Sequence, residues 1–197
     1  MEKAIDFERL KKAKIGIAGL GGLGSNIAVS LARIGIGSFV LVDFDRVEKS
    51  NLNRQQYFLR HVGSYKTDAL KEIISDINPD LKLEIKNVFI NKDNVEEIFK
   101  DVDIIVEAFD KAENKAMLVN TVLLKMPSKP IVASSGMAGY FTSNSIKTRK
   151  LRKNFYLAGD EFSDIELGYK PLAPRVSIVA NHQANMVLRL ILGEKDA

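Results

Sequence analysis

The sequence predicts an α/β fold: a Rossmann-like, mostly parallel sheet with helices on both faces, extended near its end by an antiparallel strand and a closing helix. Short apolar stretches alternate with amphipathic stretches of about 10–15 residues, which is the pattern of repeated βαβ units. A cluster of glycines marks a tight turn between the first strand and the first helix. The 197 residues, 46% of them hydrophobic, fit one domain over 1–197, because a single core seldom extends beyond roughly 250 residues.

The individual elements follow from the period of the apolar residues. The first half of the chain is predicted to hold strands at 13–20, 38–45 and 81–90 and helices at 25–35, 65–77 and 92–100. Gly35 and Gly37 end the first of these helices, and Asn78 and Pro79 end the second. The second half is predicted to hold strands at 102–110 and 129–139, a helix at 113–126, an antiparallel strand within 140–150, an irregular stretch over 151–174 and a closing helix at 175–193.

Composition and charge exclude several classes of protein. The chain has no cysteine, which excludes disulfides, thiolate zinc sites and a thiol nucleophile. No apolar stretch reaches the roughly 20 residues of a membrane span, and the charged N-terminus is unlike a secretory signal, so we expect a cytoplasmic protein with no membrane partner. A net charge of +4 and a pI of about 9.1 permit an acidic partner without requiring one, and we do not expect a nucleic-acid partner.

The stretch GLGGLGSN predicts a phosphate site. It places Gly19, Gly21, Gly22 and Gly24 between a strand and a helix, where backbone N–H groups and the helix N-terminus face a phosphate. Asp43 ends the second strand 24 residues after Gly19, a position from which an acid can bind a ribose hydroxyl. Up to this point NAD and ATP fit equally well.

The long polar segment after the second strand favours ATP. About 20 residues separate Asp45 from the next helix, whereas a dinucleotide fold has a short connection there. The segment carries Arg54, whose planar fork suits phosphate oxygens, and leads to Lys66, which can lie over the glycine turn. Cations over a triphosphate stabilise the charge of a leaving pyrophosphate, which hydride transfer does not produce. Asp110, just past the strand at 102–110, is the expected ligand of Mg²⁺.

With these motifs, the chain resembles the ThiF/MoeB/HesA family, the adenylating relatives of ubiquitin-activating enzymes, and within it the short ThiF-type proteins of thiamine biosynthesis. The matching motifs, from GLGGLGSN and LVDFDRVEKSNLNRQ to PLAPRVSIVANHQANMVLRLILG, cover roughly 13–193. The resemblance implies a reaction in which the C-terminal glycine carboxylate of a small ubiquitin-like sulfur carrier of the ThiS type attacks the α-phosphorus of Mg-ATP and releases pyrophosphate. Such a carboxylate has a pKa of about 3.3–3.7, so the reaction needs no general base, and we expect His61 and His182 to be structural.

The resemblance also assigns the residues. It gives Gly22 to the phosphate turn, Asp43 to the ribose and Lys66 to the phosphates, and it gives Asp110 with Lys111 to the metal and nucleotide. The nucleotide loop consists of Ser50, Asn51, Leu52, Asn53 and Arg54. We expect Arg54, Lys66 and Asp110 to be the catalytic residues, and Gly19, Gly21, Gly24 and Asp45 to join the nucleotide site. The small residues of ASSGMAG, 133–139, are expected to leave room for a diglycine tail.

The chain departs from the family in ways that limit its chemistry. Many relatives have paired C-x-x-C motifs and an acyl-accepting cysteine. The lack of cysteine here excludes zinc and a thioester or persulfide step, so another protein must supply the sulfur. By resemblance we expect a homodimer, and Arg9 is the one candidate ahead of the first strand for an arginine donated by a partner subunit. The run KTRKLRK, 147–153, has five cations in seven residues and is a candidate docking patch for an acidic carrier or RNA.

Three other functions stay open from the sequence. One is an ATP-dependent dehydratase that modifies threonylcarbamoyladenosine in tRNA, whose substrate carboxylate is activated in a similar way. Another is an NAD-dependent oxidoreductase, which the long loop with Arg54 and Lys66 disfavours. The third is a nucleotide-binding scaffold without catalysis.

Overall fold

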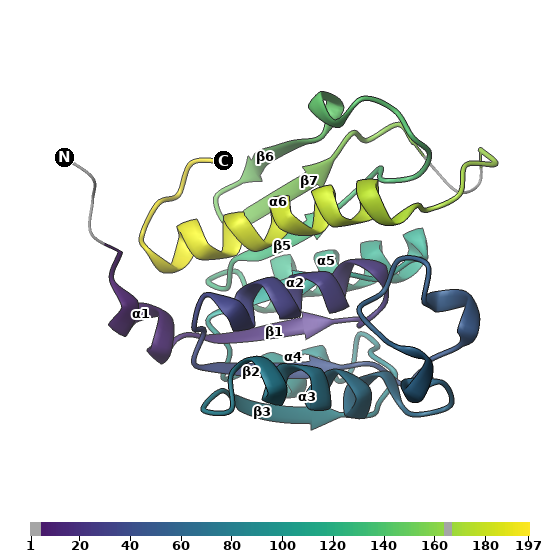
Figure 1. Cartoon of the computed structure of the whole chain (residues 1–197). Coiled ribbons are helices and arrows are strands. Elements are labelled where there is room, and N and C mark those ends of the chain that lie inside the picture. Colours follow the sequence, from purple (N-terminus) through teal and green to yellow (C-terminus); the bar gives the residue numbers. More distant parts are fainter. Residues whose placement is uncertain (1–4, 164–166) are drawn as a thin grey trace.

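The computed structural model describes residues 5–163 and 167–197, and its central feature is one seven-stranded sheet (Figure 1). The strands are β1 (Lys14–Ala18), β2 (Ser38–Val42), β3 (Lys82–Lys86), β4 (Ile104–Glu107), β5 (Ile131–Ser134), β6 (Lys147–Arg152) and β7 (Phe155–Gly159). Their order across the sheet is β3-β2-β1-β4-β5-β7-β6. All neighbouring pairs are parallel except β6 and β7, which are antiparallel.

The register of the parallel strands brings their carboxyl ends to one edge of the sheet. On β1, Ala18 lies opposite Val42 of β2 and opposite Glu107 of β4. The glycine turn after β1, Asp43 after β2 and the loop after β4 therefore leave the sheet side by side. This is the edge at which ligands bind in open α/β sheets.

Helices cover both faces of the sheet, as the alternation of strands and helices predicted (Figure 1). They are α1 (Phe7–Lys12), α2 (Gly22–Arg33), α3 (Lys66–Ile77), α4 (Val95–Phe99), α5 (Ala112–Lys125) and α6 (Ala173–Ile191), with short 3-10 turns η1 (Lys49–Asn51), η2 (Leu59–His61) and η3 (Ser143–Ser145). The larger core cluster joins α2, α3 and α6 to one face through Ile15 and Ile17 of β1. A smaller cluster joins α4 and α5 to the other face, where Ala18 points. In the described ranges, no helix is long and apolar enough to cross a membrane.

The predicted fold class is confirmed, and two details of the element prediction are wrong. The stretch at 151–174 was predicted to be irregular, but it contains β7, which extends the sheet by pairing in parallel with β5. The antiparallel strand is β6 at 147–152, later than the predicted 140–150. Helix α1, whose single buried residue is Leu10, was not among the predicted elements. Residues 164–166 of the predicted irregular stretch lie outside the described residues.

Candidate functional site

The glycine turn presents the start of α2 toward the carboxyl edge of the sheet. Gly19 follows β1, and its N–H donates to the Val42 carbonyl oxygen at 2.9 Å, which fixes the turn to β2. Gly21 is the N-cap of α2, and it offers no side chain to bond the helix. The first N–H groups of a helix have no partners inside it and carry partial positive charge. The turn can therefore receive an anionic group without rearrangement.

Gly24 has a packing role in this turn. A side chain at Gly24 would overlap with the carbonyl oxygen of Gly19, and Gly19 itself adopts a φ of +89°. The two glycines therefore let the first turn of α2 lie directly against the strand end. Gly22, in contrast, faces Val176 of α6 and the aliphatic part of Arg54.

Three charged side chains meet beside the glycine turn. Lys66, the first residue of α3, is buried, and its Nζ donates to Asp45 Oδ2 at 2.7 Å and lies 4.0 Å from Asp43 Oδ2. Asp43 is also buried and accepts the N–H of Leu20 at 2.6 Å and of Asp45 at 2.8 Å. The structure thus brings Asp43, Asp45 and Lys66 to one place at the glycine turn. The lysine is held there by carboxylates.

Burial raises the pKa of two groups beside the glycine turn, Asp43 and Tyr57. Removal from water raises the pKa of Asp43 above its ordinary value, and the neighbouring Lys66 charge opposes the rise. The pKa of Tyr57 lies well above its ordinary value, mainly because the phenol is buried and also because Asp43 and Asp45 are nearby. Tyr57 therefore remains a neutral donor, and its OH bonds the carbonyl oxygens of Leu20 at 2.7 Å and Lys66 at 3.3 Å. It ties the glycine turn to the start of α3.

Arg54 lies over Gly22 on a loop that is fastened to α2. Asn26 Nδ2 donates to the carbonyl oxygens of Gly22 at 2.6 Å and Arg54 at 3.1 Å, and Gln56 Nε2 donates to Asn26 Oδ1 at 2.6 Å. Among the described residues, the guanidinium of Arg54 bonds only to its own loop, where it donates to Asn53 Oδ1 at 2.8 Å and to the Ser50 carbonyl oxygen at 3.3 Å. The backbone of the loop is therefore fixed, while the Arg54 charge can turn toward a phosphate.

The remaining residues of the predicted nucleotide loop bond mainly to each other. Ser50 and Asn53 are exposed, and Asn51 Oδ1 accepts the N–H of Glu48 at 3.0 Å. Leu52 packs against the core. Gln55 differs from these residues. Its buried Oε1 has no hydrogen-bond partner in the part of the chain that the structure describes, and its Nε2 lies 3.7 Å from the position of a side chain at Gly21. An unpaired buried amide oxygen beside the turn can accept a donor from a ligand.

Asp110 and Lys111 lie at the same edge, in the loop between β4 and α5. This loop touches the glycine turn, because Ala108 and Phe109 are the nearest neighbours in the side-chain direction of Gly19. Both Asp110 and Lys111 are exposed, and in residues 5–163 and 167–197 no side-chain hydrogen bond or ion pair engages the Asp110 carboxylate. The same ranges hold no group of three or more His, Asp or Glu that could bind a metal. A metal at Asp110 would therefore need oxygen ligands from a substrate.

The sequence analysis did not identify a buried ion pair under this loop. Glu107 at the end of β4 is fully buried, and Lys115 of α5 donates to its two carboxylate oxygens at 3.0 and 3.2 Å and to Ser134 Oγ at 2.9 Å. Glu107 Oε1 also accepts the N–H of Phe109 at 2.7 Å. The pair joins β4, α5 and β5 and bonds the loop at Phe109, next to Asp110 in the chain. The sequence contained one sign of this buried pair, the acid Glu107 inside the otherwise apolar stretch IIVEAF.

A second buried pair fills the region of the small residues at 133–139. Asp160 and Arg175, both with almost no exposed side-chain surface, form an ion pair. Arg175 also donates to the carbonyl oxygens of Phe141 at 2.7 Å and Thr142 at 3.0 Å. At Gly136 the space for a side chain is taken by the Asp160 carboxylate. Gly136 is therefore small because of this contact, and room for a diglycine tail beside 133–139 stays a prediction.

The other sequence candidates lie apart from the glycine turn. Arg9 donates to the Leu192 carbonyl oxygen at 3.0 Å, at the amino-terminal edge of the sheet. His61 is buried and its Nδ1 accepts the N–H of Phe58 at 3.0 Å, as expected for a structural histidine. His182 of α6 contacts Thr148 Oγ1 at 3.0 Å.

Beside Asp43, two exposed aromatic rings, Phe44 and Phe89, pack edge to face with centroids 5.3 Å apart.

Comparisons with known proteins point to one family. The ThiF family model matches residues 3–197. The molybdopterin-synthase adenylyltransferase of Haemophilus influenzae is 32% identical over 199 residues, covering 96% of this chain and 80% of that protein. The tRNA threonylcarbamoyladenosine dehydratase of Escherichia coli is 33% identical over 154 residues, covering 77% of this chain and 56% of that protein. The chain thus spans little more than half of the dehydratase.

Solved structures share the fold. The crystal structure of the E. coli dehydratase TcdA in complex with ATP matches with a TM-score of 0.85 over 95% of this chain and 89% of that one, at 23% sequence identity. The structure of E. coli MccB with succinimide matches with a TM-score of 0.74 over 96% of this chain and 59% of that one, at 25% identity.

Proposed function

Because the chain belongs to the ThiF family of ubiquitin-activating-like enzymes, we propose that it adenylates the C-terminal glycine carboxylate of a small ubiquitin-like sulfur carrier of the ThiS type, as in thiamine biosynthesis. ATP is the second substrate and pyrophosphate the product. The family model covers nearly the whole chain, and a relative of similar length is named an adenylyltransferase. Cytoplasmic location and a homodimer are part of the same proposal.

The arrangement of Lys66 and Arg54 around the glycine turn is the observation that carries the proposal. Lys66 is buried beside the turn and already charge-paired, and Arg54 lies over Gly22 with a guanidinium that bonds to its own loop. A triphosphate on the N–H groups of the turn would meet both cations. The carboxylate oxygens of Asp43 would face the ribose of the bound ATP. Phe44 and Phe89 offer an apolar surface to the base of the same nucleotide.

The reaction itself needs charge and position more than proton transfer. A carboxylate oxygen of the carrier attacks the α-phosphorus, the bond from this phosphorus to the oxygen bridging to the β-phosphorus breaks, and that electron pair leaves with pyrophosphate. The product is an acyl-adenylate. Lys66 and Arg54 stabilise the negative charge that moves onto the leaving pyrophosphate. No base is required, because the attacking carboxylate is ionised at neutral pH.

Asp110 fits the magnesium ligand of such a reaction. Its carboxylate is exposed at the edge of the site, and in the part of the chain that the structure describes it has no competing partner. Mg²⁺ prefers oxygen ligands and commonly takes one or two carboxylates together with substrate phosphates. When bound, the ion would neutralise phosphate charge. The Glu107–Lys115 pair beneath the loop would keep Asp110 in position.

The edge strand β6 supports an acidic protein partner. Its cations and those of the following turn are largely exposed, namely Lys147, Arg149, Lys150, Arg152 and Lys153. Arg149 pairs with Glu161, and the ammonium of Lys150 lies 6.0 Å from the centre of the Tyr156 ring. The strand also has one unpaired edge, since β7 is its only neighbour in the sheet. An acidic carrier could use both the charge and the edge.

Carrier-dependent exchange of labelled pyrophosphate into ATP tests the proposal. We expect exchange with a carrier that ends in Gly-Gly and none with a carrier that lacks its last glycine. Arg54→Ala and Lys66→Ala should each lower the rate by roughly two or more orders of magnitude, as the loss of a preorganised donor does. Lys49→Ala is the matched control, because it removes an exposed cation from the same loop and should leave the rate almost unchanged. Absence of both exchange and ATP binding would overturn the proposal.

A second candidate function is the ATP-dependent dehydration of threonylcarbamoyladenosine in tRNA. The match to the E. coli dehydratase and the exposed cations of β6 favour it. Its signature would be ATP turnover that tRNA stimulates and that a Gly-Gly carrier does not. None of the relatives reported above is an oxidoreductase, and we do not propose hydride transfer.

In the proposed homodimer, Arg9 could act only on the partner's nucleotide. Within one chain it lies at the amino-terminal edge of the sheet, whereas the glycine turn lies at the carboxyl edge. Sedimentation equilibrium measures the oligomeric state. If the protein is a dimer, mixing Arg9→Ala chains with Lys66→Ala chains would restore exchange only if arginine is donated between subunits.

A further inference from the structure

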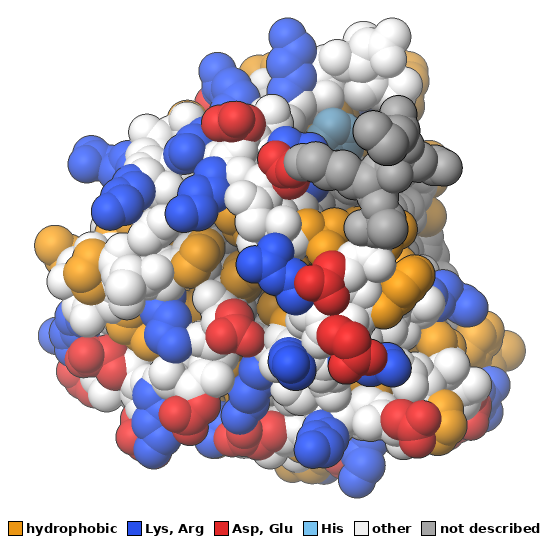
Figure 2. Space-filling model, turned by 90° about the vertical axis from the view of Figure 1, so that its left-hand side faces the viewer, with side chains coloured by type: hydrophobic (Ala, Val, Ile, Leu, Met, Phe, Trp, Pro, Cys, Tyr) orange, Lys and Arg blue, Asp and Glu red, His pale blue; other side chains and the backbone are white. Residues whose placement is uncertain are grey.

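A pocket at the amino-terminal edge of the sheet lies opposite the glycine turn and, within one chain, is separate from the site of the proposed reaction. It is an open hollow of about 400 Å³ between α1, the last turn of α6 and the residues leading into β4, β5 and β7. Figure 2 views the molecule from this edge, with exposed apolar side chains near its centre and Lys and Arg side chains around them. The volume lies within the range of about 300–1,000 Å³ that is usual for small-molecule sites.

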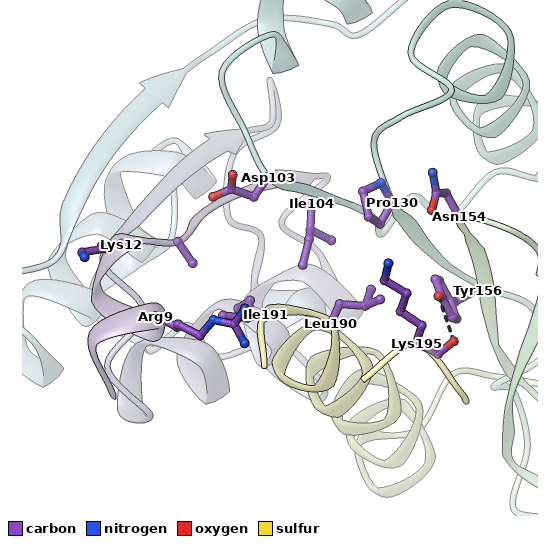
Figure 3. A pocket seen from close by; sticks show the side chains of 11 residues that line it. Arg9, Lys12, Asp103, Ile104, Pro130, Asn154, Tyr156, Leu190, Ile191 and Lys195 are labelled. Carbon is purple, nitrogen blue, oxygen red and sulfur yellow. Dashed lines mark hydrogen bonds between the residues drawn. The ribbon is translucent and has the colours of Figure 1, made fainter. Parts of the chain in front are cut away.

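The middle of the pocket is apolar. Ile104 and Pro130 line one side, and Leu190 and Ile191 of α6 line the other (Figure 3). Ile104 is almost fully buried, while the other three are partly exposed. This surface can bury the carbon skeleton of a small molecule, with a gain of about 25 cal/mol for each Å² removed from water.

Cations enter the pocket from both ends. Figure 3 shows Arg9 reaching along Ile191 from α1, while the side chain of Lys195 extends toward Pro130 from the C-terminal segment. Lys12 lies at the same end as Arg9. The backbone of Lys195 is fixed, since Tyr156 OH donates to its carbonyl oxygen at 3.1 Å. The Lys195 ammonium is therefore presented by an anchored segment.

The positive charge of the pocket is not neutralised by its own residues. Within 5–163 and 167–197, neither Lys12 nor Lys195 has a side-chain hydrogen bond or an ion pair. Asp103 is the one carboxylate in the lining, and its Oδ2 already accepts the N–H of Lys14 at 2.8 Å. Arg9 uses Nη1 to donate to the Leu192 carbonyl oxygen and approaches Asp6 at 3.9 Å, outside the pocket lining.

We propose that this pocket binds a small organic anion, a carboxylate or a phosphate monoester, whose apolar part lies on Ile104, Pro130, Leu190 and Ile191. Arg9 and Lys195 hold the anionic group. Arg9 and Lys195 carry like charges at the two ends of the pocket, and an anion bound between them is attracted by both. The planar fork of arginine bonds two oxygens of a carboxylate or phosphate at once. The site gives this fold a second binding function, at the edge of the sheet opposite the proposed adenylation site.

Titration of the ¹⁵N-labelled protein with phenyl phosphate and with benzoate tests this site, in the presence of a saturating non-hydrolysable ATP analogue. We expect saturable shifts of the amides of Ala13, Asp103 and Asn154, which line the pocket, and the tighter of the two probes identifies the preferred anionic group. Phenol and inorganic phosphate should bind at least about tenfold more weakly, since each lacks one half of the recognition.

Charge-matched variants make the test specific. Lys195→Gln should weaken binding of the better probe about tenfold, the loss expected for one charged hydrogen bond, and Arg9→Gln should do the same. Lys11→Gln is the control, because this substitution removes the same charge outside the pocket. Lys11 is exposed on α1 and pairs with Glu8. The Lys195 variant also leaves the contact between Arg9 and Leu192 and the bond from Tyr156 OH to the backbone of residue 195 in place. Equal weakening by Lys11→Gln, or shifts confined to the glycine turn, would overturn the proposal.

Discussion

Replacement of Lys115 by methionine tests the buried ion pair beneath the β4 loop. The change keeps most of the side-chain volume but leaves the carboxylate of Glu107, which has no exposed surface, without its counterion. Breaking a buried pair from one side costs about 3–5 kcal/mol. Two facts place this case at the lower end of that range. About a fifth of the Lys115 side chain is exposed, and the N–H groups of Phe109 and Ser134 still bond the carboxylate.

We therefore expect Lys115→Met to lower the free energy of unfolding by about 3 kcal/mol, measured by urea denaturation followed by circular dichroism. For a protein of this size, that corresponds to a melting temperature lower by roughly 6–12 °C. Lys125→Met on the same helix is the control. Lys125 pairs with Glu96 at 3.1 Å, but both side chains are about half exposed, so its loss should cost less than about 1 kcal/mol.

A double variant separates lost charge pairing from lost packing. With Glu107→Gln added, no carboxylate is left without a counterion, so the double variant should be more stable than Lys115→Met alone. The reasoning fails if Lys115→Met costs no more than Lys125→Met, or if Glu107→Gln destabilises the protein equally with and without Lys115. Either result would mean that the pair does not couple β4 to α5.

Other changes test the turn, the second buried pair and a histidine. Gly24→Ala should destabilise the protein by about 2 kcal/mol or more in urea denaturation, because its Cβ would overlap with the Gly19 carbonyl oxygen, and a cost below about 0.5 kcal/mol would contradict the packing role. Asp160→Asn leaves the buried Arg175 charge without its counterion and should cost about 3 kcal/mol by the same measurement, whereas an unchanged midpoint would show that the carbonyl oxygens alone satisfy the guanidinium. Burial lowers the pKa of His182 in the folded state, whereas the ordinary value of about 6.5 applies to the unfolded chain. The stability that the neutral form of His182 contributes is therefore complete above about pH 6.5, and it is lost as the pH falls through the lower pKa of the folded state. Compared with His182→Gln in a series of urea titrations, the wild type should lose more stability on acidification; parallel pH profiles would contradict this.

The sequence was sufficient for the fold class because the deciding features are local. The apolar period, the glycine turn after β1 and the acids after β2 each lie within a few residues, and together they place the turn, Asp43 and Asp45 at one edge of the sheet. Strand β7 was not predicted, because its five residues FYLAG are neither long nor strictly alternating. Its place in the sheet depends on its pairing with β5, which lies more than 20 residues earlier in the chain.

The candidate site was predictable in its residues but not in its contacts. Sequence reasoning assigned Lys66 and Asp45 to the same edge, yet only the folded chain shows that they bond to each other. The pair of Asp160 and Arg175 joins two segments that follow the last predicted parallel strand, and no sequence period connects them. Partners of buried charges are selected by tertiary packing, which leaves at most a single signal in the sequence, such as an acid inside an apolar strand.

The pairing of Lys66 with Asp45 determines how this lysine would act in the proposed reaction. A buried ammonium without a counterion would be costly, so the two carboxylates stabilise the charge that the site needs before a nucleotide arrives. A triphosphate that binds would then replace or share an existing partner of Lys66, and the net gain in ground-state affinity would be small. As pyrophosphate departs, its charge grows while that of Asp45 does not, so the stabilisation by Lys66 increases toward the transition state. Loss of Lys66 should therefore lower kcat much more than it raises the KM for ATP.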